Sequence, residues 1–584
     1  MAVKFKDLSL EDQNDYRDRM RHSAAHVLAE AVTNLFPEAQ LTIGPPIADG
    51  FFYDFAISEP FTPEDIKRIE LKMRDSIKAN TKFVERETSR DEALELVKDN
   101  PYKVEILKAI PADERVTFCS HSDNAFEDLC RGGHMERTGD IKAYKLLSSA
   151  GAYWRGDENN PMLQRIYGTA WESRDAQKDY LRRRDEAEKR DHRKLGRSLG
   201  LFFFDPIAPA SPFFLPKGTH VINSLIDYMR ELYDAYGYQE VITPQIFNTE
   251  LWKRSGHLDA YAENMYFLDV DEREFGVKPM NCPAAAMLYL ANSRSYRELP
   301  IRMADFGRLH RNERSGVTHG LNRVRSFVQD DAHIFCAFHQ ISAEITSFLQ
   351  MLNESYQVFG FENTRFELSL RPEKRVGSDE MWDHAESILT EVLDATGHKY
   401  TAQSGEGAFY GPKIDAFVPD AIGREWQLGT VQLDFSLPER FDMEYTAENG
   451  NRDRPVVIHR AMLGSLERFL GVLIEHLSGA FPMWLAPVQA VIVPIADRHN
   501  EFCFEVGKRI SEAGFRVDVN DSNDRMNAKI RQAQLQKIPY MLVAGDREVE
   551  AKSLSVRTRS GDNLDPMSID QVIDRFTKQV ADRS

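Results

Sequence analysis

A highly charged segment at residues 174–198 constrains the fold of this chain more than any other feature. It contains ten Lys or Arg and six Asp or Glu residues, and its composition favours helix. Such a segment is typical of a solvated connecting helix, so it predicts a domain boundary. The length of 584 residues points the same way, because roughly one domain per 150 residues predicts about three or four domains.

The patterns on either side of this segment predict different kinds of domain. Residues 11–36 read as an amphipathic helix, and residues 51–173 mix strand-like and helical pieces. Residues 199–483 alternate β-rich stretches with helices, which predicts a large α+β domain around an antiparallel sheet. Residues 484–584 follow a β-α-β-α-β order, which predicts a small α/β domain with a mostly parallel sheet.

Composition excludes several classes of protein. No apolar run approaches the roughly 18 residues of a membrane span, and the charged N-terminus lacks the apolar core of a signal peptide. Five cysteines are too few for a disulfide framework. These observations predict a cytoplasmic enzyme without a membrane partner. The net charge of −18 argues against nucleic acid, but phosphate contacts need only a local basic surface, so nucleic-acid binding stays open.

The densest group of functional side chains lies at residues 306–336, which read as a strand, a polar loop and a second strand. Guanidinium groups suit phosphate, and an aromatic ring can stack on a base. The alternative interpretation of these residues is a basic hairpin that only faces solvent. Period-two alternation predicts two sets of side chains that share a face: Arg311 and Glu313 on the first strand, and Arg323, Arg325, Phe327 and Gln329 on the second.

A second candidate anion site follows the strand-like residues 456–461. Gly464 and Ser465 precede an apolar helix, and Arg468 lies in its first turn. Backbone N–H groups, the positive end of the helix and an arginine together attract anions.

Cys282 raises a separate question. It stands alone in KPMNCPAAAML, ahead of an apolar run and without a nearby cysteine. A core residue, a nucleophile and a metal ligand are all compatible with this context, and the first is the commonest.

Two histidine pairs stand near the N-terminus. His22 and His26 share one helix stripe at i, i+4, away from the apolar arc, so neither reads as core filler. Cys130 and His134 repeat the spacing in EDLCRGGH. By ligand count, the four residues read as a zinc site.

The longer sequence blocks resemble a known family. Residues 306–336 and the candidate anion site that runs from residue 456 to Arg468 resemble motifs 2 and 3 of class II aminoacyl-tRNA synthetases. The stretch GYQEVITPQIF with Pro244 resembles motif 1, the dimer-interface strand. A resemblance to threonyl-tRNA synthetase covers nearly the whole chain in these blocks: KPMNCP, FGRLHRNE, HGLNRVRSFVQDDAHIF, EGAFYGPKID, QLGTVQLDF, HRAMLGSLERF, GAYWRGDENNPMLQRIYGTAW and IPYMLVAGDREVE.

The resemblance implies a domain order and a reaction. Residues 1–173 would form an editing domain, 174–198 a charged linker helix, 199–483 the class II catalytic domain and 484–584 an anticodon-binding domain. The implied enzyme is a homodimer that activates L-threonine with ATP, transfers it to the 3′ end of tRNA(Thr), and hydrolyses mischarged Ser-tRNA(Thr).

The resemblance also implies a zinc ion, one per chain, held by Cys282, His333 and His459. Threonine would fill the open zinc positions with its amino and hydroxyl groups. A site built to bind a hydroxyl rejects isosteric valine by about 10⁴-fold or more. The family positions that line the threonine pocket correspond to Gln329, Asp331, Tyr410 and Gln432.

For the nucleotide, the resemblance implies one role for each matching residue. Mg²⁺ would accompany ATP, and His257 would assist transfer to tRNA. The remaining contacts would be Arg311 with the α-phosphate, Glu313 with the adenine amino group, Phe327 stacked on adenine, and Arg468 with the γ-phosphate.

The same four N-terminal residues resemble the family's editing site, and a metal ion there stays an alternative that we do not favour. His22, His26, Cys130 and His134, with Asp128, would orient water and the ester. Such a site is needed for serine, because a missing methyl group is worth only about 1–3 kcal/mol of discrimination. Anticodon contacts would fall to Asn523, Lys537, Glu548 and Arg557.

The chain also departs from the family pattern. It starts close to the editing domain without the small ubiquitin-like domain of many members, and Ala284 and Ala285 replace Gly and His after MNCP. Lys537 stands where arginine is more usual. The alternative function is therefore a synthetase-like paralogue that acts mainly as a Ser-tRNA deacylase or as an RNA-binding regulator.

Overall fold

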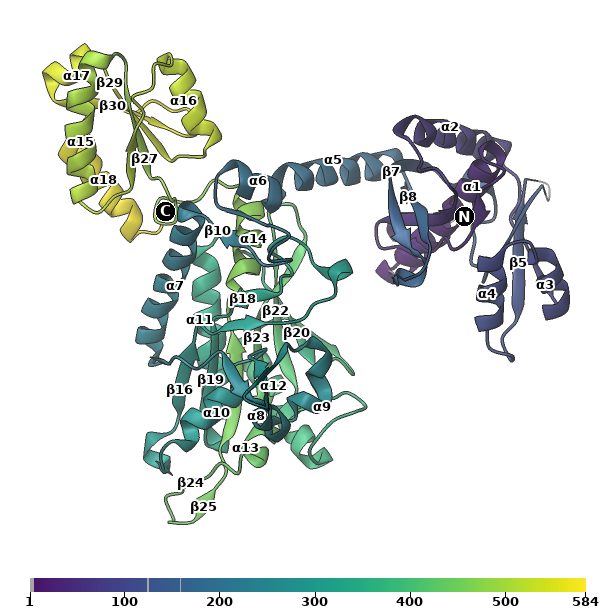
Figure 1. The fold of residues 1–584 in the computed structure, drawn as a ribbon, viewed down its shortest axis with the longest axis horizontal. Helices are drawn as coiled ribbons and strands as arrows, with labels where there is room; N and C mark the ends of the chain where they lie inside the picture. The colour runs from purple at the N-terminus through teal and green to yellow at the C-terminus, as the bar shows by residue number, and fades with distance from the viewer. Residues whose placement is uncertain (1–4, 123–124, 158) are drawn as a thin grey trace. The chain divides into compact units, whose positions relative to one another are not determined.

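The computed structural model describes residues 5–122, 125–157 and 159–584. The chain divides into two compact units, Met1–Asp185 and Glu186–Ser584 (Figure 1). Among the described residues, no helix combines the length and the apolar character needed to cross a bilayer.

The first unit is built around helix α1. Ser9 caps its N-terminus by accepting the Asp12 N–H, and the helix is buried along most of its length from Met20 to Val32. One sheet has the order β1-β3-β8-β7 with β2 on β3, and another has the order β4-β5-β6. The elements are α1 Leu10–Leu35, β1 Gln40–Leu41, β2 Pro46–Ile47, β3 Gly50–Ala56, α2 Pro63–Ala79, β4 Val84–Thr88, α3 Arg90–Val97, α4 Pro101–Ala109, β5 Val116–His121, β6 Phe126–Leu129, β7 Ala143–Tyr153 and β8 Met162–Trp171.

The charged segment forms two helices, α5 (Arg174–Arg190) and α6 (His192–Ser198). Asp191 separates them and caps α6 by accepting the Arg193 N–H at 2.8 Å. No residue of α5 is buried, whereas His192 and Gly196 are. The prediction of one solvated helix over 174–198 is therefore wrong for its last turns. The reason is that α6 packs against the second unit, of which it is a part.

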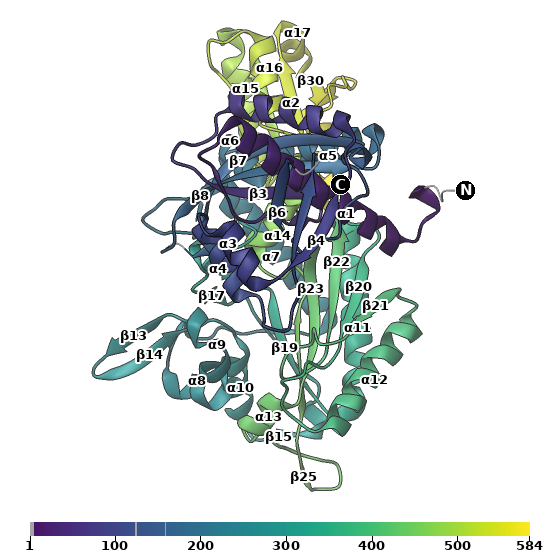
Figure 2. The ribbon, with the colours of Figure 1, turned by 90° about the vertical axis from the view of Figure 1, so that its right-hand side faces the viewer.

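The second unit contains the predicted antiparallel sheet. Its eight strands have the order β11-β16-β19-β26-β23-β22-β20-β21. The inner pairs are antiparallel, and only the edge pairs β11–β16 and β20–β21 are parallel. Figure 2 shows β19, β23 and β22 together, with helices α11 and α12 nearby. A single large core joins α7, α11, α12 and α14 to this sheet.

This part of the second unit contains the eight strands of the sheet, shorter strands outside it and several helices. The strands are β9 Phe202–Phe203, β10 Phe213–Phe214, β11 Gln239–Glu240, β12 Ile246–Asn248, β13 Phe267–Val270, β14 Arg273–Val277, β15 Arg294–Ser295, β16 Ile301–Asp305, β17 Arg308–His310, β18 Ser326–Val328, β19 Asp331–Cys336, β20 Arg365–Ser369, β21 Tyr400–Gln403, β22 Lys413–Pro419, β23 Glu425–Asp434, β24 Tyr445–Thr446, β25 Arg452–Asp453 and β26 Val456–Ala461. The helices are α7 Pro216–Tyr236, α8 Thr249–Ser255, α9 His257–Tyr261, α10 Cys282–Leu290, α11 Ile341–Val358, α12 Asp379–Thr396, α13 Ser436–Arg440 and α14 Leu466–Leu477.

The C-terminal residues form the predicted β-α-β-α-β unit and extend it. β27 pairs in parallel with β28 and β29, but β30 and β31 then add antiparallel strands. The expectation of a mostly parallel sheet therefore holds only for the first three strands. The elements are β27 Ala490–Pro494, α15 Asn500–Glu512, β28 Val517–Val519, α16 Met526–Leu535, β29 Tyr540–Ala544, α17 Asp546–Ala551, β30 Ser553–Thr558, β31 Met567–Ser568 and α18 Ile569–Ala581.

Candidate functional site

The large sheet brings the three predicted zinc residues together. His333 on β19 and His459 on β26 are direct cross-strand partners, with ring centroids 4.8 Å apart. Cys282 is the first residue of α10. One potential ligand atom from each of the three residues lies within 4.8 Å of the others. We call these residues the Cys–His–His cluster.

The surroundings of the Cys–His–His cluster suit a metal ion. Burial lowers the pKa of His333, so the histidine is neutral and able to offer a lone pair. Burial also raises the pKa of the Cys282 thiol, so a zinc ion that bound there would displace the thiol proton. Asp434 Oδ2 lies 2.9 Å from His459 Nε2. A carboxylate behind a histidine orients and strengthens a metal-binding imidazole. One thiolate and two imidazoles with an open side fit zinc.

A cavity of about 240 Å³ adjoins this cluster, and we call it the sheet cavity. Tyr410 donates a hydrogen bond to Gln432 Oε1 at 2.9 Å, and Asn281 Nδ2 donates to Asp331 Oδ2 at 3.1 Å. The sheet cavity is therefore polar where it meets the cluster. All four residues predicted for an amino-acid pocket line it: Gln329, Asp331, Tyr410 and Gln432.

A second cavity of about 400 Å³, the arginine cavity, lies beside the first. Arg311, Gln329 and Thr430 line both cavities, so ligands in the two would be neighbours. The Arg311 guanidinium carbon lies 5.1 Å from the centroid of the Phe327 ring. Among the described residues, Arg468 Nε is buried without a hydrogen-bond partner. Arg311 and Arg468 make the lining of this cavity largely cationic, and Phe327 adds an aromatic ring. Glu313 lines the same cavity.

The predicted alternation of side chains is wrong for Arg325. Strands β17 and β18 are three residues each, so Arg311, Glu313, Arg323 and Arg325 lie in the loop between them. Period-two alternation holds only for extended strands. Arg323 lines the arginine cavity and pairs with Glu313 at 3.0 Å, whereas Arg325 Nε donates to the Glu313 carbonyl at 2.8 Å. Arg325 therefore supports the loop.

His257 opens α9 and lies against the Cys–His–His cluster. Its Nδ1 is 2.8 Å from Ser255 Oγ, and its Nε2 is 3.6 Å from Cys282 Sγ. Burial lowers the pKa of His257 to about 4. It is not among the residues that line the two cavities. The imidazole is thus a neutral neighbour of the cysteine.

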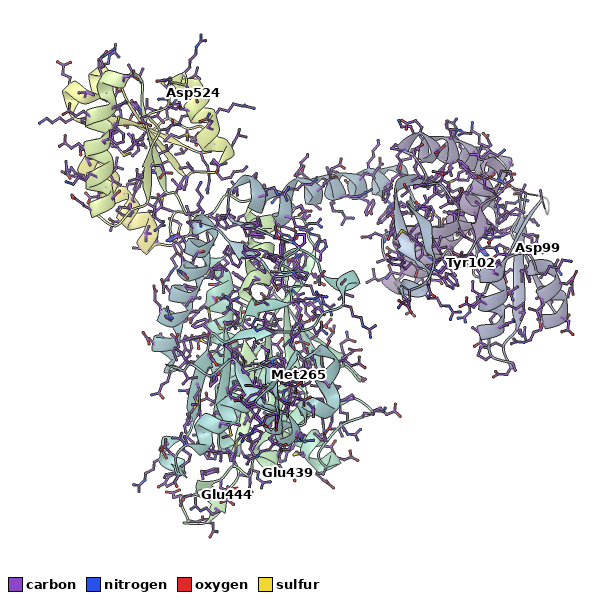
Figure 3. The ribbon with its side chains drawn as sticks, viewed as in Figure 1. Asp99, Tyr102, Met265, Glu439, Glu444 and Asp524 are labelled. Atoms are coloured by element: carbon purple, nitrogen blue, oxygen red, sulfur yellow. The ribbon has the colours of Figure 1, made fainter. Side chains whose placement is uncertain are left out.

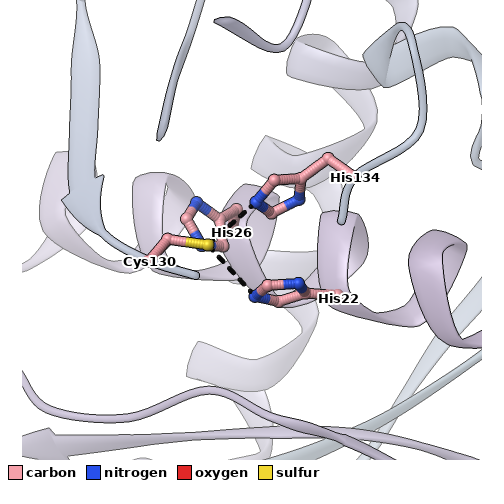
Figure 4. A group of neighbouring side chains, drawn as sticks. All are labelled: His22, His26, Cys130 and His134. Carbon is pink, nitrogen blue, oxygen red and sulfur yellow. Dashed lines mark hydrogen bonds between the residues drawn. The ribbon is translucent and has the colours of Figure 1, made fainter. Parts of the chain in front are cut away.

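The first unit contains a separate cluster, which we call the N-terminal cluster (Figure 4). His22 and His26 come from α1, and Cys130 and His134 follow β6. Cys130 Sγ lies 3.4 Å from His22 Nε2 and 3.1 Å from His134 Nε2. The His22 and His134 rings stack at 4.2 Å. All four residues lie together, as predicted.

Burial keeps the N-terminal cluster uncharged. It lowers the pKa of His134 to about 3 and raises the pKa of the Cys130 thiol to about 12. It also lowers the pKa of His22 and His26. Neutral imidazoles with such low pKa values are weak proton acceptors. The cluster is better suited to orienting polar groups than to removing protons.

The neighbours of Asp128 were missed by sequence reasoning. Buried Lys103 lies 2.7 Å from Asp128 Oδ1, and the Tyr53 hydroxyl donates to Asp128 Oδ2. Both residues line a cavity of about 490 Å³ that also contains His22, His26, Asp128 and Cys130. No sequence motif identifies Lys103 or Tyr53 as a functional residue. Only their buried positions beside Asp128 do so. We call this space the N-terminal cavity.

The predicted anticodon residues lie in or next to several elements of the C-terminal fold. Exposed Asn523 precedes α16, beside Asp524, which is labelled in Figure 3. Lys537 has φ +59°, and Arg557 lies on β30. The Glu548 carboxylate accepts the Gly545 N–H at 2.9 Å and the Ser555 hydroxyl at 2.8 Å.

Comparisons with known proteins agree along the chain. Three family models match: "tRNA synthetase class II core domain (G, H, P, S and T)" over residues 266–477, "Threonyl and Alanyl tRNA synthetase second additional domain" over 116–167, and "Anticodon binding domain" over 489–579. The chain is 49% identical to the threonine–tRNA ligase of Alkalilimnicola ehrlichii, over 97% of this chain and 88% of the relative. It is 50% identical to that of Thermotoga neapolitana, over 96% and 88%.

Solved structures are similar as well. One is the RNA-binding domain of threonyl-tRNA synthetase from Cryptosporidium parvum, with 45% identity, a TM-score of 0.65, and coverage of 67% of this chain and 98% of that one. Another is a putative threonyl-tRNA synthetase from Aeropyrum pernix, with 30% identity, a TM-score of 0.61, and coverage of 68% and 97%.

Proposed function

The chain belongs to the threonine–tRNA ligase family of class II aminoacyl-tRNA synthetases, and we propose that it activates L-threonine with ATP and transfers it to the 3′ end of tRNA(Thr). One observation carries this proposal. The Cys–His–His cluster opens on the sheet cavity, which shares three lining residues with the arginine cavity. An amino acid and a nucleotide bound there would meet. The comparisons give no support to a deacylase paralogue or an RNA-binding regulator.

Cys282, His333 and His459 would hold one zinc ion per chain. Zinc there would supply open coordination positions for the amino and hydroxyl groups of threonine. Tyr410, already bonded to Gln432, would close the pocket around the side chain. Valine has the same shape without a hydroxyl, so it would leave polar groups of the pocket unpaired.

The activation step needs no general base, because the threonine carboxylate is already ionised. It attacks the α-phosphorus of ATP, forms threonyl-adenylate and releases pyrophosphate. Catalysis is then positioning and charge stabilisation. Arg311 would bind the α-phosphate, Glu313 and Phe327 the adenine, and Arg468 the γ-phosphate, with Mg²⁺ accompanying ATP. The unpartnered Nε of Arg468 supports this role.

The N-terminal cluster would hydrolyse mischarged Ser-tRNA(Thr). His22, His26 and Cys130 are neutral and line one cavity with Asp128, and neutral His134 lies beside them, which suits the cluster to orienting water and the ester. The match of residues 116–167 to the second additional domain supports this role. We propose that this cluster binds no metal.

The remaining assignments follow the family. We propose residues 1–173 as the editing domain, 174–198 as the connecting segment, of which only α5 is solvated, 199–483 as the catalytic domain and 484–584 as the anticodon-binding domain, with contacts from Asn523, Lys537, Glu548 and Arg557. His257 would assist transfer to tRNA from beside Cys282. We also propose a cytoplasmic homodimer joined near Pro244, where the neighbouring Ile242 side chain is 89% exposed.

The test is threonine-dependent exchange of pyrophosphate into ATP, run with threonine, serine and valine, together with zinc content per chain. We expect exchange with threonine, weaker exchange with serine, none with valine, and about one zinc per chain. No exchange with any amino acid would refute the ligase proposal. Two zinc ions per chain would contradict a metal-free N-terminal cluster.

A further inference from the structure

A third cluster of titratable side chains lies in the second unit, outside both cavities. Potential ligand atoms of Asp191, His192 and Glu475 lie within 4.8 Å of one another. Each is already in use, however. His192 Nδ1 is 2.6 Å from Glu475 Oε1, its Nε2 accepts the Leu321 N–H at 2.9 Å, and Asp191 pairs with Arg193 at 2.5 Å. The cluster is therefore a hydrogen-bonded unit and not a metal site.

The contacts of His192 determine its tautomer. A backbone N–H can only donate, so Nε2 must be the acceptor and Nδ1 must carry the proton. That proton is donated to Glu475, which also accepts the His192 backbone N–H at 3.1 Å. The Arg424 guanidinium bonds to the other oxygen of Glu475. Glu475 thus holds the imidazole with its acceptor nitrogen facing Leu321.

Leu321 belongs to the turn His319–Arg323 at the tip of the loop between β17 and β18. His319 and Arg323 form an isolated antiparallel bridge across this turn. The next residues, Asn322, Arg323 and Val324, line the arginine cavity. The bonds within the bridge stay inside the loop, whereas the bond from Leu321 N–H ties the turn to α6.

The turn is also packed closely against α14. A Cβ atom on Gly471 would lie 2.7 Å from Asn322 Oδ1 and 3.2 Å from Leu321 Cβ. Leu321 itself is fully buried. A shift of the turn away from His192 would leave a buried N–H unpaired, and a shift toward α14 is blocked.

We propose that His192 is a positioning residue of the nucleotide site. Its Nε2 holds the Leu321 N–H and so sets the turn that presents Asn322 and Arg323 to the arginine cavity. This inference rests on the proposed function, because it takes the arginine cavity as the ATP site. Helix α6, expected from sequence to be a solvated linker, then supports nucleotide binding through this turn.

Two amide substitutions separate the two bonds of His192. The Nδ2 atom of Asn occupies nearly the place of Nδ1, so His192→Asn keeps the bond to Glu475 and loses the bond to Leu321. The longer Gln reaches the place of Nε2, so His192→Gln keeps an acceptor for Leu321. His476→Asn is the matched control, because His476 lies in the last turn of α14 but its ring packs against Phe361.

We expect His192→Asn to raise the KM for ATP and the calorimetric Kd for ATP by about 3- to 10-fold, the factor of one ordinary hydrogen bond. The KM for threonine and the zinc content should stay unchanged. His192→Gln and His476→Asn should stay within about twofold of the unmodified chain. Gly471→Ala should also weaken ATP binding while the chain stays folded, because alanine favours helix.

Equal effects of His192→Asn and His192→Gln on ATP, or equal losses for ATP and threonine, would overturn the inference, because both indicate general destabilisation. So would an unchanged KM and Kd in His192→Asn. If the unmodified chain binds ATP but fails to exchange pyrophosphate with threonine, the proposed function fails, and the calorimetric comparison still decides the role of His192. If the unmodified chain does not bind ATP, both fail.

Discussion

Asp330 offers the sharpest test of how the arginine cavity is held together. Its carboxylate accepts backbone N–H groups from three successive residues, Met462 at 2.9 Å, Leu463 at 3.1 Å and Gly464 at 2.8 Å. Arg460 lies 3.9 Å away, and neither side chain of this ion pair is exposed. Asp330 therefore anchors the turn that leads into α14.

Asp330→Ala would remove the acceptor of three backbone N–H groups and the counter-charge of a buried guanidinium. Breaking a buried ion pair from one side costs about 3–5 kcal/mol. At about 2.1 cal/mol/K per residue, unfolding of the roughly 400 residues from Glu186 to Ser584 has an entropy near 0.8 kcal/mol/K. The melting temperature of this unit should therefore fall by about 4–6 °C.

The assay is differential scanning calorimetry of the full chain at one scan rate. The control is Asp383→Ala, which removes an Asp that pairs with Arg371 at 2.5 Å but is 70% exposed. Exposed ion pairs contribute about 0–1 kcal/mol, so the control should shift the melting temperature by at most about 1 °C. A shift in Asp330→Ala no larger than the control would refute the reasoning.

Three further predictions concern the two clusters. Cys282→Ser should lose zinc and threonine-dependent exchange together, whereas Cys503→Ser, also a buried cysteine, should keep both; full exchange by a zinc-free variant would contradict the zinc assignment. His22→Ala should charge tRNA normally but accumulate Ser-tRNA(Thr), and unchanged clearance of Ser-tRNA would rule out the editing role. Burial lowers the pKa of His134 to about 3. Below about pH 6.5 the unfolded chain therefore binds a proton at this residue that the folded chain does not bind. Because of this residue, the free energy of unfolding of the first unit should be about 2 kcal/mol lower at pH 5 than at pH 7.5. His134→Asn should reduce the fall in melting temperature of the first unit between those pH values, and an unchanged fall would contradict the low pKa.

Local patterns predicted the elements well where one period runs through a whole element. The helix with His22 and His26 and the strand that leads to Gly464 are examples. The same reasoning failed for Arg325, because alternation was extended beyond a three-residue strand into a loop. It also failed for His192, because the charge of its neighbours conceals a side chain that is buried by tertiary contacts.

The site residues show a different limit. Cys282, His333 and His459 are 51 and 126 residues apart, so no local rule joins them, and the resemblance to a family was needed. Lys103 and Tyr53 had no such signal, because their importance comes from burial beside Asp128. Chemistry that depends on long-range pairing is visible in a sequence only when a family has already revealed the pairing.

The two histidines of the Cys–His–His cluster lie in one row across the sheet. Lys413, Gln432, His459, His333 and Met303 are successive cross-strand partners on five neighbouring strands. The backbone hydrogen bonds of the sheet therefore set the distance between the histidines, and the connecting loops do not. Insertions in connecting loops that do not line the pocket can accumulate during evolution without changing this distance. A slip of one strand by a single residue would instead turn a histidine to the opposite face.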